Sequence, residues 1–416
     1  MTTMTADPRV GPSEYKEIID ALIEFIEKAV VPIEQEHAEF LKDEVNIFDS
    51  RGLMTEKYKQ INQQVRELSA EAGFYTLYSA ESLGGAELPA AAIVEIQEAL
   101  HHRYGPERSL IHESVIPSPF TNGLSPLLLQ LQEDVLAPRI DAIRAGTSTL
   151  CFALSEPDAG SDVYNLKTRA IAVDGGWVIN GQKQWISNAA HAKHAFVFAV
   201  TDPEAVASRS GGITCFFVDT DSAGFSVDAG IPIMGKRGSN ATILSFTDLK
   251  VTPEQIIGEE GKGLNLAMGG ISRGRVTMSA TCIGVAQWAL DQALEYSKTR
   301  KTFGKTIGQH QMIQSKLAEI ARDIYLCKSA VQRTAALLDA GFPAIKETSI
   351  IKFSCTEMLS RVVDEVMQIH GGLGLTNELG LEGAYRFART LRIPDGTSEI
   401  QRRTVAKRLL AGDTKL

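Results

Sequence analysis

The chain has 416 residues and a formal net charge of -9, so its length allows two or three domains and its charge argues against a nucleic-acid partner. Hydrophobic residues make up 44% and charged residues 22%, as in globular proteins, and no apolar run is long enough to span a membrane. The five cysteines are far apart, which indicates reduced thiols and argues against a disulfide framework or a zinc site. The N-terminus shows no secretory signal pattern, and we therefore expect a soluble, cytoplasmic enzyme.

The first third of the chain has helical patterning. The first dozen residues are polar and expected to be disordered, and Ser13 is a candidate N-cap for the first helix. Apolar residues then recur at helical spacing at Ile18, Leu22, Phe25, Ile26 and Val30. Further helices are expected at residues 56–72, 89–104 and 124–145. The pattern predicts an all-α domain over residues 13–148.

Short β-rich segments follow. Strands are expected at residues 195–200, 213–218 and 241–246. The pair Asn180–Gly181 within 177–185 predicts a hairpin turn. Several strands without helices between them predict a small β-barrel or sandwich over residues 149–256.

The rest of the chain, residues 257–416, returns to helical patterning. Helices are expected at residues 264–299, 307–340, 343–369 and 397–411, and their lengths predict a four-helix bundle. The expected fold is therefore a multidomain α+β fold in the order α, β, α. An all-helical or all-β protein is excluded.

Two segments of the β part are candidates for a cofactor site. Residues 152–162 read as a strand entering a turn of small residues, where free N–H groups and the hydroxyls of Ser155 and Ser161 suit a planar cofactor or a pyrophosphate. An ordinary strand-to-loop junction is the alternative. In residues 184–188, Trp185 and Ser187 could present an indole face and a hydroxyl to a ring system. The alternative is a core tryptophan.

Two further segments lie in the C-terminal part. In residues 300–311, Arg300 could hold a pyrophosphate and Phe303 could pack against an adenine or a neighbouring subunit, although a solvated basic turn is the alternative. Residues 368–372 are followed by 394–401, where Ser398 with Gln401 predicts a capping box at a helix start. Helix N-termini favour anions, and the alternative is a capped helix with no further role.

Together, the order and spacing of these four segments resemble the acyl-CoA dehydrogenase family from about Ser13 to Leu410. The resemblance implies FAD and a homodimer or homotetramer in which one subunit reaches the FAD of another. It implies these cofactor contacts: Phe152, Leu154, Ser155, Gly160, Ser161, Trp185, Ser187, Arg300, Thr302, Phe303, Gln311, Gln368, Gly371, Gly372, Thr397 and Glu399. The implied substrate contacts are Ser161, Arg275 and Gly396, and no metal is implied.

The reaction that the resemblance implies is α,β-dehydrogenation of an acyl-CoA to a trans-2-enoyl-CoA in fatty acid β-oxidation. A carboxylate takes the α-proton, a hydride passes from the β-carbon to flavin N5, and hydrogen bonds stabilise the thioester oxygen as enolate character develops. The backbone N–H of the base-bearing residue usually donates one of those bonds. An electron-transferring flavoprotein is the usual acceptor of the electrons.

The catalytic base is where this sequence departs from most of the family. Most members have Glu where this chain has Asp395, and a minority place Glu before the residue matching Arg275, where this chain has Gly274. The resemblance therefore leaves Asp395 as the base. The segment 391–396 resembles a subgroup that carries Asp, and the approach to it looks about three residues shorter than usual, which would bring the backbone closer to the substrate. Either Arg275 or Arg402 could orient Asp395, and a surface role is the alternative for Arg402.

Two rival functions remain open. Nitroalkane oxidases resemble this family and also use Asp; binding of a CoA thioester and slow reoxidation by oxygen would distinguish the dehydrogenase. A flavin-free binding protein that kept the fold is the second rival, and the colour of the purified protein decides it. Longer acyl-CoA oxidases are disfavoured, because the chain lacks their additional C-terminal domain.

Overall fold

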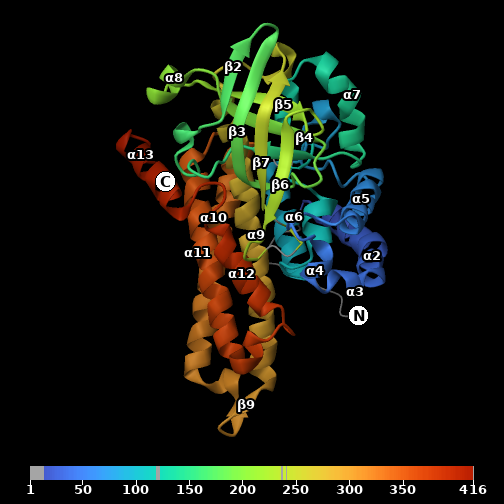
Figure 1. Cartoon of the computed structure of the whole chain (residues 1–416). Coiled ribbons are helices and arrows are strands. Elements are labelled where there is room, and N and C mark those ends of the chain that lie inside the picture. Colours follow the sequence, from blue (N-terminus) through green and yellow to red (C-terminus); the bar gives the residue numbers. More distant parts are fainter. Residues whose placement is uncertain (1–13, 119–121, 236–237, 240, 416) are drawn as a thin grey trace.

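The computed structural model describes residues 14–118, 122–235, 238–239 and 241–415. The expected N-cap Ser13 and the polar tail before it lie outside these residues. Figure 1 shows a helical N-terminal part, a twisted sheet beside and above it, and a long bundle that extends away from the sheet. The order α, β, α that the sequence predicts is therefore confirmed.

Most helices of the N-terminal part pack around one apolar core, while the last of them packs through Ile143 on a core shared with the sheet. Leu22, Ile26 and Val30 are buried in the first of these cores, as their helical spacing predicts. The helix that the sequence places around them is divided, because Ile26–Val30 forms a π-helical turn between α1 and α2. The helices are α1 (Lys16–Phe25), α2 (Val31–Glu36), α3 (Ala38–Leu41), α4 (Glu44–Ile47), α5 (Glu56–Glu71), α6 (Ala90–Tyr104) and α7 (Glu133–Arg144).

The middle part is one eight-stranded sheet. Its path is β6-β7-β3-β2-β4-β5-β8, and β1 pairs with β4 in parallel. A short helix, α8 (Pro203–Ala207), interrupts the expected run of strands between β4 and β5. The strands are β1 (Leu150–Ala153), β2 (Arg169–Val173), β3 (Gly176–Ser187), β4 (His194–Val200), β5 (Ile213–Asp219), β6 (Phe225–Ile231), β7 (Ala241–Val251) and β8 (Ile256–Ile257).

The hairpin predicted at Asn180–Gly181 is wrong. Both residues lie inside the continuous strand β3, at a register shift in its pairing with β7, and the turn lies earlier, between β2 and β3. Asn180 pairs through its side chain with Asp248 on β7, at 3.1 and 2.9 Å. A Cβ on Gly181 would lie 2.5 Å from the hydroxyl of Thr168. The Asn-Gly pair therefore marks a bulge with a close backbone approach.

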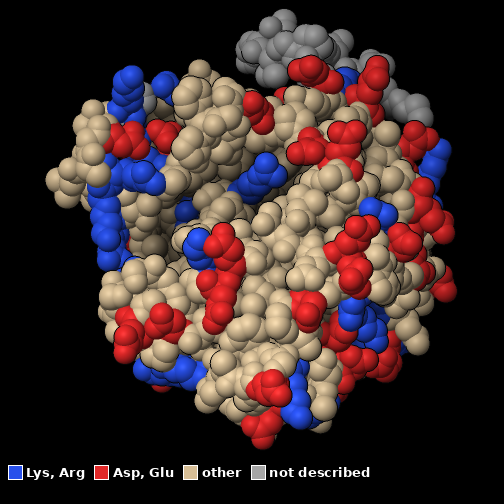
Figure 2. Space-filling view, turned by 90° about the horizontal axis from the view of Figure 1, so that it is seen from above, with Lys and Arg blue, Asp and Glu red and all other residues tan. Residues whose placement is uncertain are grey.

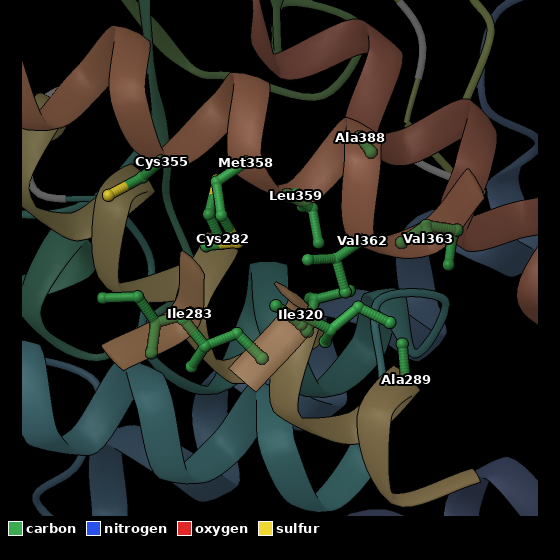
Figure 3. Close-up of a cluster of buried hydrophobic side chains, with 14 of the residues drawn as sticks. Cys282, Ile283, Ala289, Ile320, Cys355, Met358, Leu359, Val362, Val363 and Ala388 are labelled. Atoms are coloured by element: carbon green, nitrogen blue, oxygen red, sulfur yellow. The ribbon is translucent and has the colours of Figure 1, made fainter. Parts of the chain in front are cut away.

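The C-terminal part is a bundle built on long helices. The four predicted helices are confirmed as α9 (Gly263–Thr299), α10 (Gln311–Asp339), α11 (Ile345–His370) and α13 (Ser398–Leu410). A fifth, α12 (Leu381–Leu391), was not predicted, although its apolar residues recur at helical spacing and are buried. Figure 3 shows the core, where Ile283, Ile320 and Leu359 converge from α9, α10 and α11. The small antiparallel pair β9 (Lys301–Thr302) and β10 (Lys305–Thr306) closes the far tip.

Candidate functional site

The turn that carries Asp395 connects α12 to α13 and has an unusual backbone. Asp395 has a φ of 56° and Gly396 a φ of 89°, so two consecutive residues are left-handed. A non-glycine residue in this region costs about 1–2 kcal/mol and persists only where its surroundings hold it. The turn is therefore a strained segment that the neighbouring helices must stabilise.

Three buried side chains from three helices hold this turn by its carbonyl oxygens. The Asp395 carbonyl accepts hydrogen bonds from Arg275 Nε at 3.1 Å and from Gln401 Nε2 at 2.9 Å. The Gly396 carbonyl accepts from Gln401 Nε2 at 3.0 Å and from Lys352 Nζ at 2.9 Å. Arg275 lies on α9, Lys352 on α11 and Gln401 on α13, so the position of the turn depends on the packing of the whole bundle.

The capping box predicted for Ser398 and Gln401 is wrong in its residues. Helix α13 does begin here, but its N-cap is Thr397, whose hydroxyl accepts from the N–H of Ile400 at 3.4 Å. Ser398 is the first helical residue. Gln401 instead turns back onto the Asp395–Gly396 carbonyls, so a residue assigned to the cap stabilises the turn.

The carboxylate of Asp395 lies against α9. A Cβ on Gly274 would be 3.3 Å from Asp395 Oδ2, and beyond its own stretch of helix no other atom of the described residues would lie within 4 Å of it. Burial lowers the pKa of the neighbouring Arg275, and the Asp395 carboxylate opposes that shift. The side chain of Asp395 is thus beside a buried guanidinium that also binds its own carbonyl.

Arg402, the other candidate for orienting Asp395, is engaged elsewhere. Its guanidinium makes a bidentate pair with Glu357 on α11, at 2.8 and 2.7 Å, and lies 4.6 Å from the ring of Phe353. The structure thus brings Arg275, and not Arg402, into contact with the Asp395 turn.

Lys352 is a residue of this site that sequence reasoning missed. It occupies the buried face of α11 together with Ser349, Cys355 and Leu359, at the i, i+3 and i+7 spacing of core positions. A lysine in such a stripe is rarely buried without a partner. The sequence could therefore have shown that Lys352 needs a partner. It could not have shown which one, because the partner is a backbone carbonyl 44 residues later.

The predicted cofactor residues of the β part come together in the structure. Strand β1 ends at Ala153, and the following turn is tied to β3 by a hydrogen bond of 3.0 Å from the N–H of Gln184 to the Ser155 carbonyl. Beneath the turn, fully buried Lys183 donates to Glu156 at 2.8 Å and to the Leu154 carbonyl at 3.0 Å. Burial lowers the pKa of Lys183. This ion pair fixes the turn onto the sheet.

Trp185 is turned out of the sheet. Its φ is 67°, and it lies at a register shift of β3 between Gln184 and Ile186. A bulge of this kind changes the direction of a side chain, and the indole is 52% exposed while Ile186 is buried. Ser187 is also exposed. The alternative of a core tryptophan is therefore wrong for Trp185.

The remaining predicted cofactor residues lie at the far tip of the bundle. Arg300, Thr302 and Phe303 follow the end of α9, and stacking of Tyr296 on His370 at 4.5 Å brings the end of α11 beside them. Phe303 is 96% exposed with a φ of 52°. Exposed with it at this end are Gln311, Gln368, Gly371 and Gly372. Figure 1 shows this tip, marked by β9, at the opposite end of the molecule from the sheet.

The tip and the Asp395 site are far apart because α9, which connects them, has 37 residues. At 1.5 Å per residue the helix is about 55 Å long, and Arg275 lies in its first half while Arg300 directly follows its end. Two groups of predicted cofactor residues thus exist in one chain, one beside the sheet and one at the tip. A single flavin dinucleotide beside Asp395 cannot contact both groups of the same chain.

The residues present fit FAD. An exposed indole with a hydroxyl two residues on offers a stacking face and a donor, and the exposed turn after β1 offers backbone groups and Ser161. At the tip, a Cβ on Gly371 or Gly372 would meet nothing within 4 Å, so their backbone is open to a ligand. All five cysteines are free, and the described residues include neither a metal-ligand cluster nor a helix suited to crossing a membrane.

Comparison with known proteins gives the same picture. Residues 151–249 match the family model of the acyl-CoA dehydrogenase middle domain, and residues 261–410 match that of the C-terminal domain. The human mitochondrial short-chain specific acyl-CoA dehydrogenase is 35% identical over 83% of this chain and 82% of its own length. The 3-(aryl)acrylate reductase of Clostridium sporogenes is 32% identical over 93% of this chain and 98% of its own.

A solved structure agrees with these relatives. Butyryl-CoA dehydrogenase from Megasphaera elsdenii superimposes with a TM-score of 0.80 and 28% identity, covering 95% of this chain and 97% of that one. The similarity extends over all three parts of the fold. The folded chain and the arrangement of its parts are thus shared with known flavoenzymes.

Proposed function

Because the chain belongs to the acyl-CoA dehydrogenase family, an FAD-dependent family of oxidoreductases, we propose that it oxidises an acyl-CoA thioester to the trans-2-enoyl-CoA with Asp395 as the base. The observation that carries the proposal is the Asp395 turn. Its carboxylate lies at a fixed place beside α9, and three buried donors hold the backbone on either side of Gly396. Such preorganisation is what proton abstraction from carbon requires.

The residues of this chain have distinct roles in the proposed reaction. FAD, when bound, supplies the hydride acceptor. In this reaction Asp395 takes the α-proton, and its own backbone N–H donates to the thioester oxygen as negative charge develops there. Gly396 and Arg275 complete the substrate side; a Cβ on Gly396 would lie 2.5 Å from Gln401 Nε2, so the glycine lets that amide close on the turn. Ser161 serves both the cofactor and the substrate.

The aspartate is part of the same proposal. Its side chain is one methylene shorter than that of glutamate, so the backbone must approach the substrate more closely. The left-handed pair Asp395–Gly396, drawn toward the bundle by its carbonyls, supports such an approach. We assign the chain to the subgroup that uses Asp on this basis.

A second subunit completes the flavin site in our proposal. Arg300, Thr302 and Phe303 lie about 35 Å or more from Arg275 along α9, so they serve the cofactor of a partner. The near-complete exposure of Phe303 supports this role, because its ring is accessible to a partner subunit. The result is at least a homodimer in which each subunit contributes its tip to the other.

The CoA part of the substrate carries phosphates, and the surface offers a place for them. Figure 2 shows a hollow on the face seen from above, with Lys and Arg as well as Asp and Glu side chains at its rim. Basic groups at a rim attract anions even when the net charge of the whole chain is -9.

The wider assignments rest on the family and its relatives. A relative from Acetobacterium woodii, 33% identical over 85% of this chain, is a subunit of a caffeyl-CoA reductase complex with an electron-transferring flavoprotein, so we propose such a flavoprotein as the electron acceptor. We also propose a role in fatty acid β-oxidation in the cytoplasm; free, mostly buried thiols suit a reducing compartment.

An anaerobic titration tests the proposal. The purified flavoprotein is mixed with a panel of acyl-CoAs that differ in chain length and branching, and bleaching of the flavin is followed for wild type and Asp395→Asn. We expect bleaching of wild type by at least one acyl-CoA and none of the variant. Equal bleaching of both would remove Asp395 as the base. Bleaching by nitroalkanes alone would favour an oxidase. Reoxidation of dithionite-reduced wild type by enoyl-CoAs, without bleaching of the oxidised enzyme by acyl-CoAs, would favour a reductase.

A further inference from the structure

The buried lysine Lys352 has a contact that a purely structural lysine does not need. Its side chain is fully buried on α11, and its ammonium donates to the Gly396 carbonyl at 2.9 Å. Removing an ammonium from water is costly unless a strong acceptor or an opposite charge compensates for it. The acceptor is the backbone of the turn that carries Asp395, and the nearby carboxylates are those of Asp395 and Glu399.

The geometry points to Lys352 as a positioning residue that fixes the Gly396 carbonyl and holds a positive charge behind the Asp395 carboxylate. This inference rests on the proposed function, because it assigns the lysine to the base proposed above. The contact acts on more than one group because the peptide bond is planar. When the Gly396 carbonyl is held, the direction of the Thr397 N–H in the same peptide group is fixed as well. Thr397 is the N-cap of α13, so the hydrogen bond sets the turn and the start of that helix together.

The positive charge is the second part of the role. A cation near a carboxylate favours its ionised form, which is the form that accepts a proton from carbon. The groups that face Lys352 are Asp395 in the turn, Arg275 and Cys282 on α9, and Glu399 on α13. Burial is the main cause that lowers the pKa of Lys352 to about 8, and Asp395 opposes it. The charge is therefore present at neutral pH and lost as the pH rises above about 8.

The same helix provides a matched control. Lys346 is also fully buried on α11, and its ammonium donates to Asp413 near the C-terminus, at 2.8 Å to the carboxylate. It therefore shares the helix, the burial and the residue type with Lys352, but it serves the last segment of the chain. A general effect of removing a buried lysine would be the same in both.

The experiment is anaerobic rapid mixing of the FAD-loaded enzyme with the acyl-CoA that bleaches wild type. The flavin reduction rate constant and the substrate dissociation constant are measured from about pH 6 to 9.5 for wild type, Lys352→Met, Lys352→Arg and Lys346→Met. We expect Lys352→Met to lower the rate constant roughly 10- to 100-fold, with the dissociation constant changed less than about threefold. Lys346→Met should keep the wild-type rate constant.

The pH profile separates positioning from mere packing. We expect the wild-type rate constant to fall as the pH rises through about 8. Lys352→Arg should recover most of the rate and abolish that fall, because a guanidinium stays charged. A rate constant for Lys352→Met within about threefold of wild type at every pH, or an equal loss in Lys346→Met, would overturn the inference. If Lys352→Met fails to retain flavin, the pH profiles of the rate constant in wild type and Lys352→Arg are compared instead. If the two profiles are the same near pH 8, the inference is overturned.

The proposed function and this inference fail separately. If no acyl-CoA bleaches wild type, or if Asp395→Asn is bleached as well, the proposed function is wrong. If Asp395→Asn is inactive while Lys352→Met behaves as wild type, only the role of Lys352 is wrong.

Discussion

Gly274 faces the carboxylate of Asp395: a Cβ on Gly274 would lie 3.3 Å from Asp395 Oδ2. Gly274 precedes Arg275, at the position where a minority of the family places its base. A side chain at position 274 on α9 and the side chain of Asp395 in the turn before α13 would therefore point to the same place. This chain has a small residue at one position and a short carboxylate at the other.

We predict that the proposed base can be moved between the two positions. We expect Asp395→Ala to lower the flavin reduction rate constant roughly 10²–10⁴-fold, the usual contribution of a general base. Adding Gly274→Glu should recover at least about tenfold, since the room left by Asp395 accepts the new carboxylate and Glu is a better helix former than Gly. Gly274→Gln in the same background is the control. Recovery with Gln as large as with Glu would show that packing, and not a carboxylate, restores the rate.

Local patterns predicted the elements well, and long-range contacts decided the rest. The helical spacing of Leu22, Ile26 and Val30, and the α, β, α order, follow from period and composition, which each segment carries in itself. The Asn180–Gly181 pair misled because the same residues serve a bulge when the strand beside them, β7, extends the sheet. No local pattern reports that β7 lies there.

The site divides in the same way. The Asp395 turn and the start of α13 were predicted from neighbouring residues, whereas the exposure of Trp185 was left open there beside a core tryptophan. The contact of Gln401 could not be predicted in this way. Its amide could bind either the cap of its own helix or the preceding turn, and the packing of the bundle places it on the turn. The choice between Arg275 and Arg402 depended on Glu357, which is distant in sequence from both.

Arg275 and Arg402 provide a second prediction. We expect Arg275→Lys to lower the flavin reduction rate constant roughly tenfold or more, because lysine cannot reproduce the Nε hydrogen bond to the Asp395 carbonyl. Arg402→Lys should change the rate less than about threefold and cost at most about 1 kcal/mol of stability, since its pair with Glu357 is half exposed. Stopped-flow bleaching and thermal unfolding of both variants measure this. A larger rate loss in Arg402→Lys would return the orienting role to Arg402.

A third prediction concerns acid stability. His112 is half-buried and stacks on His101 at 3.9 Å. Its Nε2 donates to the Gly105 carbonyl at 2.6 Å, since a carbonyl oxygen can only accept. Burial lowers the pKa of His112 from 6.5 to about 4. The unfolded chain then binds the extra proton between these values, so stability present above pH 6.5 is lost as the pH falls toward 4. The loss amounts to about 3 kcal/mol.

Denaturant unfolding at a series of pH values tests this. His112→Gln keeps a donor toward the Gly105 carbonyl but cannot bind a proton, so its stability should depend less on pH between 6.5 and 4. His102→Gln is the control, because His102 is exposed and pairs with Asp291 at 2.7 Å. An acid slope unchanged in His112→Gln would contradict the assignment.

The exposed Phe303 gives the sharpest test of the shared flavin site. We expect Phe303→Ser to lose bound FAD, whereas Phe342→Ser, an exposed phenylalanine just past the end of α10, should retain it. Phe303→Ser and Asp395→Ala are each expected to be inactive. When the two are refolded together, a hybrid dimer has one site with both Asp395 and the partner's Phe303 intact. Because half of the dimers are hybrids with one working site each, activity should return to about a quarter of wild type. No recovery above the two parents would show that Phe303 serves the flavin of its own chain, or none.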